Sequence, residues 1–254
     1  MHATVVRTVA PLLAEARPSS TQISQLLRGH HAEVLEGVGD WLRVRGVDGY
    51  TGWCHAGYLS VAPWDAATLR SGWSDERRMS LGCTVRAPSG AQMALPLGGL
   101  LEPDEVVVAG VVMNYRGRAR SFVSDVDVIV RHAVDLFTGA PYQWGGVTPW
   151  GADCSGFVQT LFALHGIQLP RDAWQQGERG TPVPVDMTAL YPGDLFFFSD
   201  RDDARITHVA LSMGGTSVAH CSLAHGGFNV DALNADTAVA AYLRKTFQFS
   251  RRIV

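Results

Sequence analysis

The chain has 254 residues, of which 46% are hydrophobic and 18% are charged, a composition typical of a globular protein with a substantial core. Its formal net charge of −3 gives no support to nucleic-acid binding or to attraction by an anionic membrane. Every apolar run is shorter than the roughly 18 residues of a membrane-spanning helix, so no membrane partner is expected.

The first residues predict a strand and not a targeting signal. Residues 1–10 lack a basic start and a continuous apolar block, whereas Val5, Val6 and Val9 suit the first strand of a domain. We therefore expect a cytoplasmic protein, or a secreted one if a signal peptide preceded this chain.

The cysteines are widely spaced and form no Cys-x-x-Cys pair, so structural zinc is not expected. They are Cys54, Cys83, Cys154 and Cys221. Reduced thiols fit the cytoplasmic expectation, and we expect neither a metal nor another cofactor.

Short strand-like runs fill the N-terminal part of the chain. Residues 32–36 and 41–45 alternate apolar and polar side chains, and residues 37–40 between them predict a hairpin turn. About five such strands predict a small barrel over residues 1–62. The run Gly39-Asp-Trp-Leu-Arg-Val44, followed by Gly49-Tyr-Thr-Gly-Trp53, resembles bacterial SH3-like domains.

Residues 63–121 combine a linker with a second strand-rich segment. The stretch 63–78 is polar and irregular, which is typical of a linker. From Met79 to Gly117, turn residues separate apolar runs, of which residues 106–113 form a continuous one. This pattern predicts a second, degenerate barrel of the same kind.

The pattern changes over residues 122–254. Apolar spacing predicts one helix over 126–137 and another over 154–165. Strands are predicted at 194–199, 206–213 and 217–221. Helices followed by strands predict an α+β domain with an antiparallel sheet, so the whole chain is expected to be multi-domain, with all-β barrels first.

Cys154 is the strongest candidate for chemistry. It stands at the predicted start of a helix, where unpaired backbone N–H groups and the helix dipole favour the nucleophilic thiolate. Asp153 or Ser155 suits the cap of that helix. The alternative is a buried, inert cysteine beside a helix cap.

Two of the nine histidines suit the base that a cysteine nucleophile needs. His208 and His220 lie on two apolar runs joined by residues 214–216, which predict a hairpin turn. A two-residue Gly-Gly turn would put the two rings on opposite faces, so we expect a three-residue loop or a bulge at 214–216 that brings them to one face. His225 follows in a Gly-flanked loop where nothing in the sequence fixes it, and the other histidines are interpreted as structural.

Six ordered motifs in residues 122–254 resemble the NlpC-type family of bacterial cell-wall cysteine peptidases. They are Pro141-Tyr-Gln-Trp-Gly-Gly146, Asp153-Cys-Ser-Gly-Phe-Val158, Leu169-Pro-Arg-Asp172, Pro192-Gly-Asp-Leu-Phe-Phe197, Thr207-His-Val-Ala-Leu211 and Ala219-His220.

This resemblance implies a papain-like α+β core in which Cys154 is the nucleophile, His208 the base and His220 the residue that orients His208. It also implies hydrolysis, without a metal, of peptidoglycan stem peptides at the bond between γ-D-glutamate and a diamino acid, either diaminopimelate or lysine.

Members with N-terminal SH3-like domains are similar to enzymes that cut stem peptides with a free N-terminal L-alanine, which implies recycling of short murein peptides. The resemblance implies that Asp153 binds the ammonium group, Ser155 hydrogen-bonds the substrate and Trp144 lines the pocket. Tyr50 and Glu15 are the candidates from the first barrel.

Other roles remain open for these residues. Asp153 has helix capping as its alternative and Trp144 has packing in a core, while Tyr142 and Arg171 are expected to be structural. Ala173 stands where relatives often carry a hydroxyl residue, so one hydrogen bond to substrate is expected to be missing.

Three other functions compete with peptide recycling. They are a secreted hydrolase of intact peptidoglycan, a non-catalytic wall-binding module, and an acyltransferase or amidase that uses the same cysteine and histidine. The combination of Cys154, His208 and His220 favours catalysis over binding, because a binding module has no use for a helix-capped thiol beside two histidines.

Overall fold

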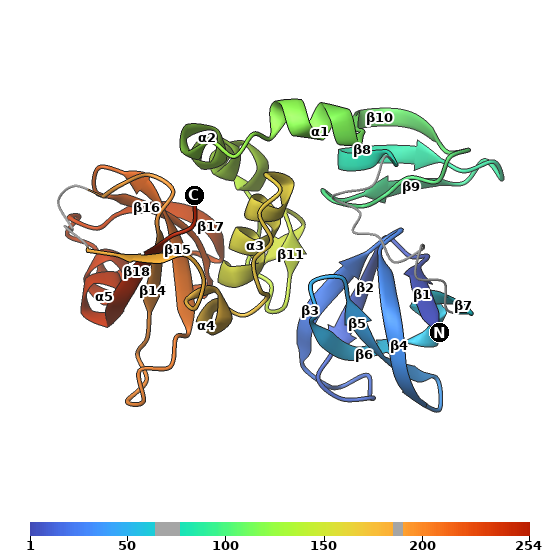
Figure 1. Ribbon diagram of the computed structural model, residues 1–254, viewed down its shortest axis with the longest axis horizontal. Coiled ribbons are helices and arrows are strands. Elements are labelled where there is room, and N and C mark those ends of the chain that lie inside the picture. The colour runs from blue at the N-terminus through green and yellow to red at the C-terminus, as the bar shows by residue number, and fades with distance from the viewer. Residues whose placement is uncertain (64–76, 185–189) are drawn as a thin grey trace. The chain divides into compact units, whose positions relative to one another are not determined.

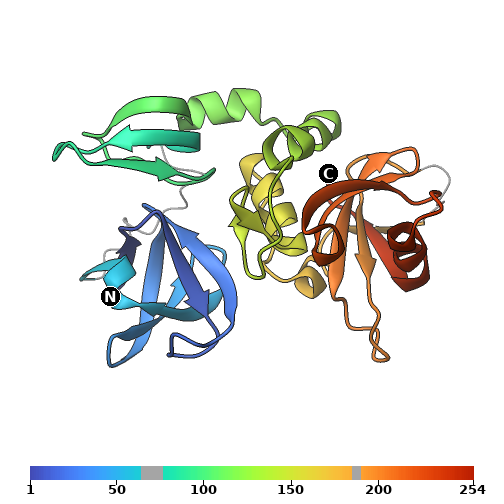
Figure 2. The same cartoon turned by 180° about the vertical axis from the view of Figure 1, so that it is seen from behind.

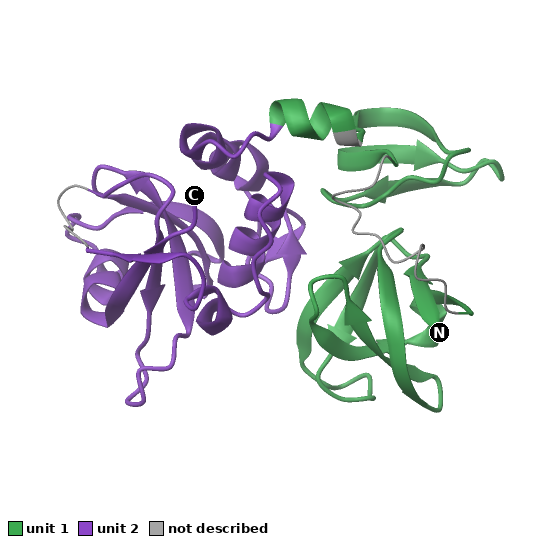
Figure 3. Cartoon of the chain, in the orientation of Figure 1, with its two compact units in different colours: residues 1–121 green, residues 122–254 purple. Residues whose placement is uncertain are grey.

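The computed structural model describes residues 1–63, 77–184 and 190–254 (Figure 1, and from behind in Figure 2). It divides into two compact units, Met1–Ser121 and Phe122–Val254 (Figure 3). The linker expected over 63–78 lies outside the described residues except at its ends. Among the helices of the described ranges, none combines the length and apolar character needed to cross a bilayer.

The first part of unit 1 is an all-β structure. Its strands form one antiparallel sheet in the order β3-β2-β6-β5-β4-β1-β7, and the short helix η1 (Ala56–Tyr58) connects β6 to β7. The strands are β1 (His2–Val5), β2 (Val9–Leu13), β3 (Gln22–Leu27), β4 (His31–Val38), β5 (Trp41–Gly46), β6 (Thr51–His55) and β7 (Leu59–Ala62). The expected hairpin joins β4 to β5, with Val38 paired to Trp41.

The apolar residues that alternate along these strands meet in one core, which explains why this pattern folds as a sheet. They are Val5, Ala10, Leu12, Leu26, Ala32, Val44 and Cys54, and each is buried. The all-β fold expected for this part of the chain is confirmed.

The second part of unit 1 is a smaller sheet. Strands β8 (Met79–Arg86), β9 (Gln92–Leu95) and β10 (Val106–Met113) pair in the order β10-β8-β9, and helix α1 (Tyr115–Ser121) follows. In the described residues this segment is therefore a three-stranded open sheet and not a second closed barrel. Within unit 1, Nη2 of Arg28 lies 2.7 Å from Oε1 of Glu105, so a buried ion pair connects the two sheets.

Unit 2 is an α+β domain. Its sheet is antiparallel throughout, in the order β13-β18-β14-β15-β16-β17, as expected from the sequence. The strands are β13 (Thr181–Val183), β14 (Leu195–Phe198), β15 (His208–Gly214), β16 (Ser217–Ser222), β17 (Gly227–Ala232) and β18 (Phe247–Arg252), beside a small pair, β11 (Val147–Thr148) and β12 (Gly151–Ala152).

Among the described residues, the helices of unit 2 are α2 (Val126–Phe137), α3 (Cys154–Leu164), α4 (Ala173–Gln176) and α5 (Ala238–Thr246), and the segment Leu223–His225 forms the short 3-10 helix η3. Both helices predicted from apolar spacing, α2 and α3, are present. Helix α3 packs against β15 and β16, the strands that carry His208 and His220 (Figure 1).

Candidate active site

Helix α3 begins at Cys154 because the residue before it caps the helix. Oδ1 of Asp153 accepts a hydrogen bond from the backbone N–H of Gly156 at 2.7 Å, which satisfies one of the free N–H groups of the first turn. Gly156 is required there, because a Cβ at this position would overlap the carbonyl oxygen of Gly146. The helix start is thus fixed on both sides of Cys154, and the capping role of Asp153 is confirmed.

The hairpin of β15 and β16 carries the two candidate histidines on one face. Leu211 pairs with Ala219, whereas Gly214 pairs with Ser217, so one extra residue lies in β15 between Ser212 and Gly214. The predicted extra residue is present, but it is Met213, one residue before the expected range of 214–216. Gly214 and Gly215 have φ of 86° and 62°, a conformation that suits glycine; Gly214 follows the extra residue, and Gly215 begins the turn.

Because of this bulge, His208 and His220 lie diagonally across the two strands and touch. Nε2 of His208 is 2.8 Å from Nδ1 of His220. If His208 takes a proton on Nδ1, its Nε2–H donates to His220. Nδ1 of His220 must then be unprotonated in order to accept this hydrogen bond. The arrangement therefore suits His208 as a base and His220 as the residue that orients it.

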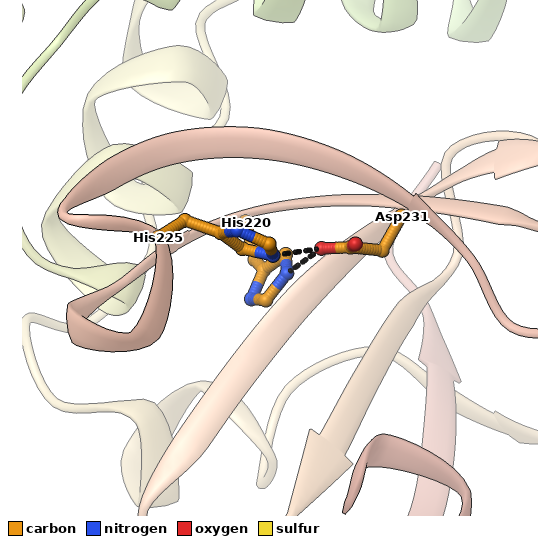
Figure 4. Close-up of side chains that lie close together, drawn as sticks. All are labelled: His220, His225 and Asp231. Carbon is orange, nitrogen blue, oxygen red and sulfur yellow. Dashed lines mark hydrogen bonds and ion pairs between the residues drawn. The ribbon is translucent and has the colours of Figure 1, made fainter. Parts of the chain in front are cut away.

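A carboxylate completes this chain of hydrogen bonds. Nε2 of His220 lies 2.8 Å from Oδ2 of Asp231 on β17 (Figure 4). The bond to His220 lowers the pKa of Asp231 to about 2, so the carboxylate is ionised and accepts the Nε2 proton. Asp231 thus favours the His220 tautomer in which Nδ1 is free to accept from His208.

The thiol lies against the same strand as His208. The backbone N–H of Val209, the residue after His208, donates to Sγ of Cys154, as does the N–H of Ser155. Burial raises the pKa of the Cys154 thiol to about 12, and the nearby Asp153 carboxylate adds to the increase. Burial also lowers the pKa of His208 to about 3, with a contribution from His220.

These shifts describe a site that disfavours an isolated charge of either sign. Burial therefore opposes the expected effect of the helix start, because it raises the pKa of the Cys154 thiol and favours its protonated form in the free protein. A proton that passes from Cys154 to His208 creates both charges at once, and their attraction in a dry site offsets part of that cost. The site is suited to forming the thiolate at the moment of attack.

Asp153 has a second partner besides the helix. Nη1 of Arg171 is 3.0 Å from Oδ1 and Nη2 is 2.7 Å from Oδ2, in a pair whose side chains are 1% and 11% exposed. The hydroxyl of Ser155 donates to Oδ1 at 3.3 Å, and the N–H of Gly145 donates to Oδ2 at 2.8 Å. A carboxylate offers about four lone-pair positions, so the acceptor capacity of Asp153 is already filled. Arg171 is structural, as expected.

The other predicted substrate residues have different surroundings. Trp144 is 62% exposed, so the alternative that it packs in a core is wrong. Ser155 is buried, and its hydroxyl accepts from Arg171 at 2.9 Å. Tyr50 and Glu15 belong to unit 1, where Tyr50 is half-buried and Glu15 forms an exposed ion pair with Arg17. Their contact with substrate stays a prediction.

Tyr142 and Asp231 are two residues of the site whose roles were not predicted from the sequence. Tyr142, which we expected to be structural, lies in the electrostatic environment of Cys154, and burial raises its pKa, so its hydroxyl keeps its proton and is a donor. Asp231 was not predicted. The alternation of Asn229 and Asp231 in a strand directly after His220 was the available signal, since His220 pairs with Asn229 and so shares a face with Asp231.

The described cysteines are all free and buried, including Cys221 beside His220. Burial raises the pKa of Cys221, with a further increase from Cys154. Cys54 and Cys83 lie in unit 1 with raised pKa values as well, so Cys154 is distinguished by its neighbours and not by its acidity.

Two family models match this chain. The model described as the NlpC/P60 family matches residues 139–246, and the bacterial SH3 domain model matches residues 8–60. Each match lies in the part of the chain where the sequence motifs predicted such a domain and where the structure has the corresponding fold.

Known proteins of the same kind are similar over long stretches. A gamma-D-glutamyl-L-lysine dipeptidyl-peptidase from Bacillus cereus is 27% identical over 252 residues, which cover 86% of this chain and 73% of that protein. A probable endopeptidase NlpC from Escherichia coli is 36% identical over 116 residues, which cover 45% of this chain and 70% of that protein. A solved NlpC/P60 family protein from Bacillus cereus has the same fold, with a TM-score of 0.76 at 20% identity over 100% of this chain and 99% of that one.

Proposed function

Because the chain belongs to the NlpC/P60 family and is a cysteine-type peptidase, we propose that it hydrolyses the bond between γ-D-glutamate and a diamino acid in peptidoglycan stem peptides. The diamino acid is diaminopimelate or lysine. The observation that carries the proposal is the hydrogen bond between His208 and His220 beside a helix that begins at Cys154. The Bacillus cereus relative, whose name specifies a γ-D-glutamyl-L-lysine bond, supports the choice of substrate.

The first half of the reaction forms a thioester. Nδ1 of His208 takes the Cys154 proton as Sγ attacks the γ-carbonyl carbon, so thiolate and imidazolium form together. Nε2–H of His208 donates to His220, and Nε2–H of His220 donates to Asp231, so the positive charge on His208 is stabilised by an aligned chain of hydrogen bonds ending in a carboxylate.

The second half of the reaction returns the proton. His208 protonates the nitrogen of the departing diamino acid, which leaves the γ-glutamyl group on Sγ. His208 then takes a proton from water, and the water oxygen attacks the thioester carbonyl and releases the free acid. In both halves the carbonyl oxygen gains negative charge. The backbone N–H of Cys154 is the donor proposed to stabilise it, and the Tyr142 hydroxyl is a second donor available near the thiol.

We include in the proposal that the substrate carries a free N-terminal L-alanine. A dipeptidyl-peptidase, the activity in the name of the Bacillus cereus relative, releases a dipeptide from a free amino end. For Asp153 to bind that ammonium group, one of its donors must give way. The Ser155 hydroxyl makes the longest of the three hydrogen bonds to Oδ1, at 3.3 Å, and its rotation toward the substrate would let the ammonium group take its place. Asp153 and Ser155 would then act together.

Defined peptides test the proposal. Purified protein is incubated with L-Ala-γ-D-Glu-diaminopimelate, with the corresponding lysine peptide, and with the N-acetylated form of each, and products are identified by mass spectrometry. We expect L-Ala-γ-D-Glu and the free diamino acid from the unblocked peptides, and no product from a Cys154→Ala variant. Equal cleavage of blocked and unblocked peptides contradicts the requirement for a free amino group.

The proposed role is the recycling of short murein peptides in the cytoplasm. Intact peptidoglycan sacculi serve as the competing substrate in the same assay. Release of peptides from sacculi, without cleavage of soluble tripeptides, contradicts the recycling role and favours wall hydrolysis. Fractionation of the source cells, followed by detection of the protein, tests the location.

A further inference from the structure

His225 has no part in the reaction described above, yet its position is fixed close to it. It ends the short helix η3, where its backbone N–H bonds to Oγ of Ser222 at 3.4 Å and the following Gly226 adopts φ of 71°. From there its Nε2 lies 2.8 Å from Oδ2 of Asp231, the same oxygen that His220 contacts. Two imidazoles and a carboxylate therefore converge on one point (Figure 4).

These three side chains form a set of donors suited to a metal ion. One ring nitrogen of His220, one of His225 and a carboxylate oxygen of Asp231 all lie within 4.8 Å of one another, and the Nε2 atoms of both histidines lie 2.8 Å from Oδ2 of Asp231. Two histidines and a carboxylate are a common ligand set for zinc and for other divalent transition metals, with a further position left for water. The His225 side chain is 27% exposed, which gives an ion a route to ligands that are otherwise buried.

We propose that His220, His225 and Asp231 form a binding site for a divalent transition-metal ion such as Zn²⁺, and that the bound ion inhibits hydrolysis. No metal was expected from the sequence, and the proposed reaction needs none. The ion acts at this site because it competes for an atom that the reaction uses, Nε2 of His220.

The inhibition follows from where the protons must be. Without a metal, the His220 proton sits on Nε2 and points to Asp231, so Nδ1 accepts from His208. A metal ion needs the lone pair of Nε2, so the proton moves to Nδ1 and points at Nε2 of His208. Nε2 of His208 must then accept, which leaves its own proton on Nδ1. No nitrogen of His208 remains free to take the proton of Cys154.

The first test measures binding without the thiol, which could itself ligate a metal. Co²⁺, whose visible absorption reports coordination, is titrated into the Cys154→Ala variant. We expect one equivalent to bind, without the charge-transfer band of a thiolate ligand. The double variant Cys154→Ala/His225→Gln should bind about tenfold more weakly or worse, since even outer-shell partners of a metal are worth 10- to 100-fold.

The matched control is Cys154→Ala/His132→Gln, which removes a histidine of unit 2 outside the cluster. His132 contacts His165 at 3.2 Å instead, so this variant should bind Co²⁺ like the parent. Absence of binding to the parent, or equal binding after the loss of His225 and of His132, overturns the proposed site. This result does not depend on which peptide the protein cleaves.

The second test concerns inhibition. The rate of peptide cleavage is followed against Zn²⁺ concentration, and each variant is normalised to its own metal-free rate. We expect the half-inhibiting concentration to rise about tenfold or more in His225→Gln and to stay unchanged in His132→Gln. An unchanged value in His225→Gln would show that zinc acts through Cys154 and would overturn the inhibitory role.

Discussion

Arg171 holds Asp153 by two parallel hydrogen bonds, at 3.0 Å to Oδ1 and 2.7 Å to Oδ2. Asp153 is the residue directly before the nucleophile and also caps helix α3. The guanidinium therefore fixes the start of the helix. Because it is a bidentate partner, it also fixes the direction in which the Cys154 side chain points from the helix. Because the pair is neutral as a unit, it attracts a substrate ammonium less than a lone carboxylate would.

Replacing Arg171 by methionine should destabilise unit 2. The substitution keeps an apolar stem but leaves a buried carboxylate without its countercharge, a change that typically costs about 3–5 kcal/mol. Urea unfolding measures the free energy of unfolding of both proteins. The control is Arg201→Met, which removes an exposed ion pair with Asp203 in the same unit and should leave the unfolding midpoint nearly unchanged. Similar effects of the two substitutions would contradict a structural role for the buried pair.

Cys154→Ala should abolish turnover, because it removes the sulfur atom on which the proposed thioester forms. Circular dichroism should show an unchanged fold, and the variant should still bind the peptide. The matched control is Cys221→Ala, which removes a second buried thiol that lies beside His220 and has no role in the reaction. It should keep most of the activity. Hydrolysis by Cys154→Ala, or its loss in Cys221→Ala, would contradict the assignment.

The free protein should contain little thiolate at neutral pH. Burial raises the pKa of Cys154 to about 12, which means that the protonated thiol persists as the pH rises and that the thiolate appears only in strongly alkaline solution. The ultraviolet absorbance of thiolate is measured in the wild type and in Cys154→Ala. We expect their difference to stay close to zero up to about pH 10, roughly two units below the pKa. A difference that grows near neutral pH would show a preformed thiolate–imidazolium pair.

Asp231→Ala should lower kcat more than it changes KM. Asp231 does not contact the reacting atoms, but it positions His220 and selects its tautomer, and general acid–base catalysis is worth about 100-fold or more in total. We expect a loss of about tenfold or more in kcat, measured on a defined tripeptide. Asp203→Ala, which removes an exposed carboxylate of the same unit, is the control. A change confined to KM would place Asp231 in substrate binding instead.

Residues that are close in sequence were the easier part to predict. The α3 start at Cys154 follows from a capping aspartate, a glycine-rich loop before it and apolar residues at helical spacing after it. The bulge beside Gly214 was also predictable, because two histidines twelve residues apart can share a face only if the hairpin contains one extra residue.

Contacts that depend on burial could not be predicted in the same way. The sequence shows that Cys154 begins a helix, but only the packing of α3 against β15 shows how much water is excluded, and that exclusion determines the direction of the pKa shift. Asp231 was not predicted, for a related reason. Its strand, β17, carries mixed polar and apolar residues with no strong pattern, and its pairing with β16 sets its position.

The extra residue in β15 has a consequence for how this protein can change over time. Sequence variation in the turn is tolerable as long as the glycines keep their conformations, whereas a single insertion or deletion between His208 and His220 would swap which side chains of one strand face inward. Deletion of one residue there would leave a hairpin that still folds but an enzyme without activity. The spacing of twelve between the two histidines should therefore tolerate gains or losses only in pairs.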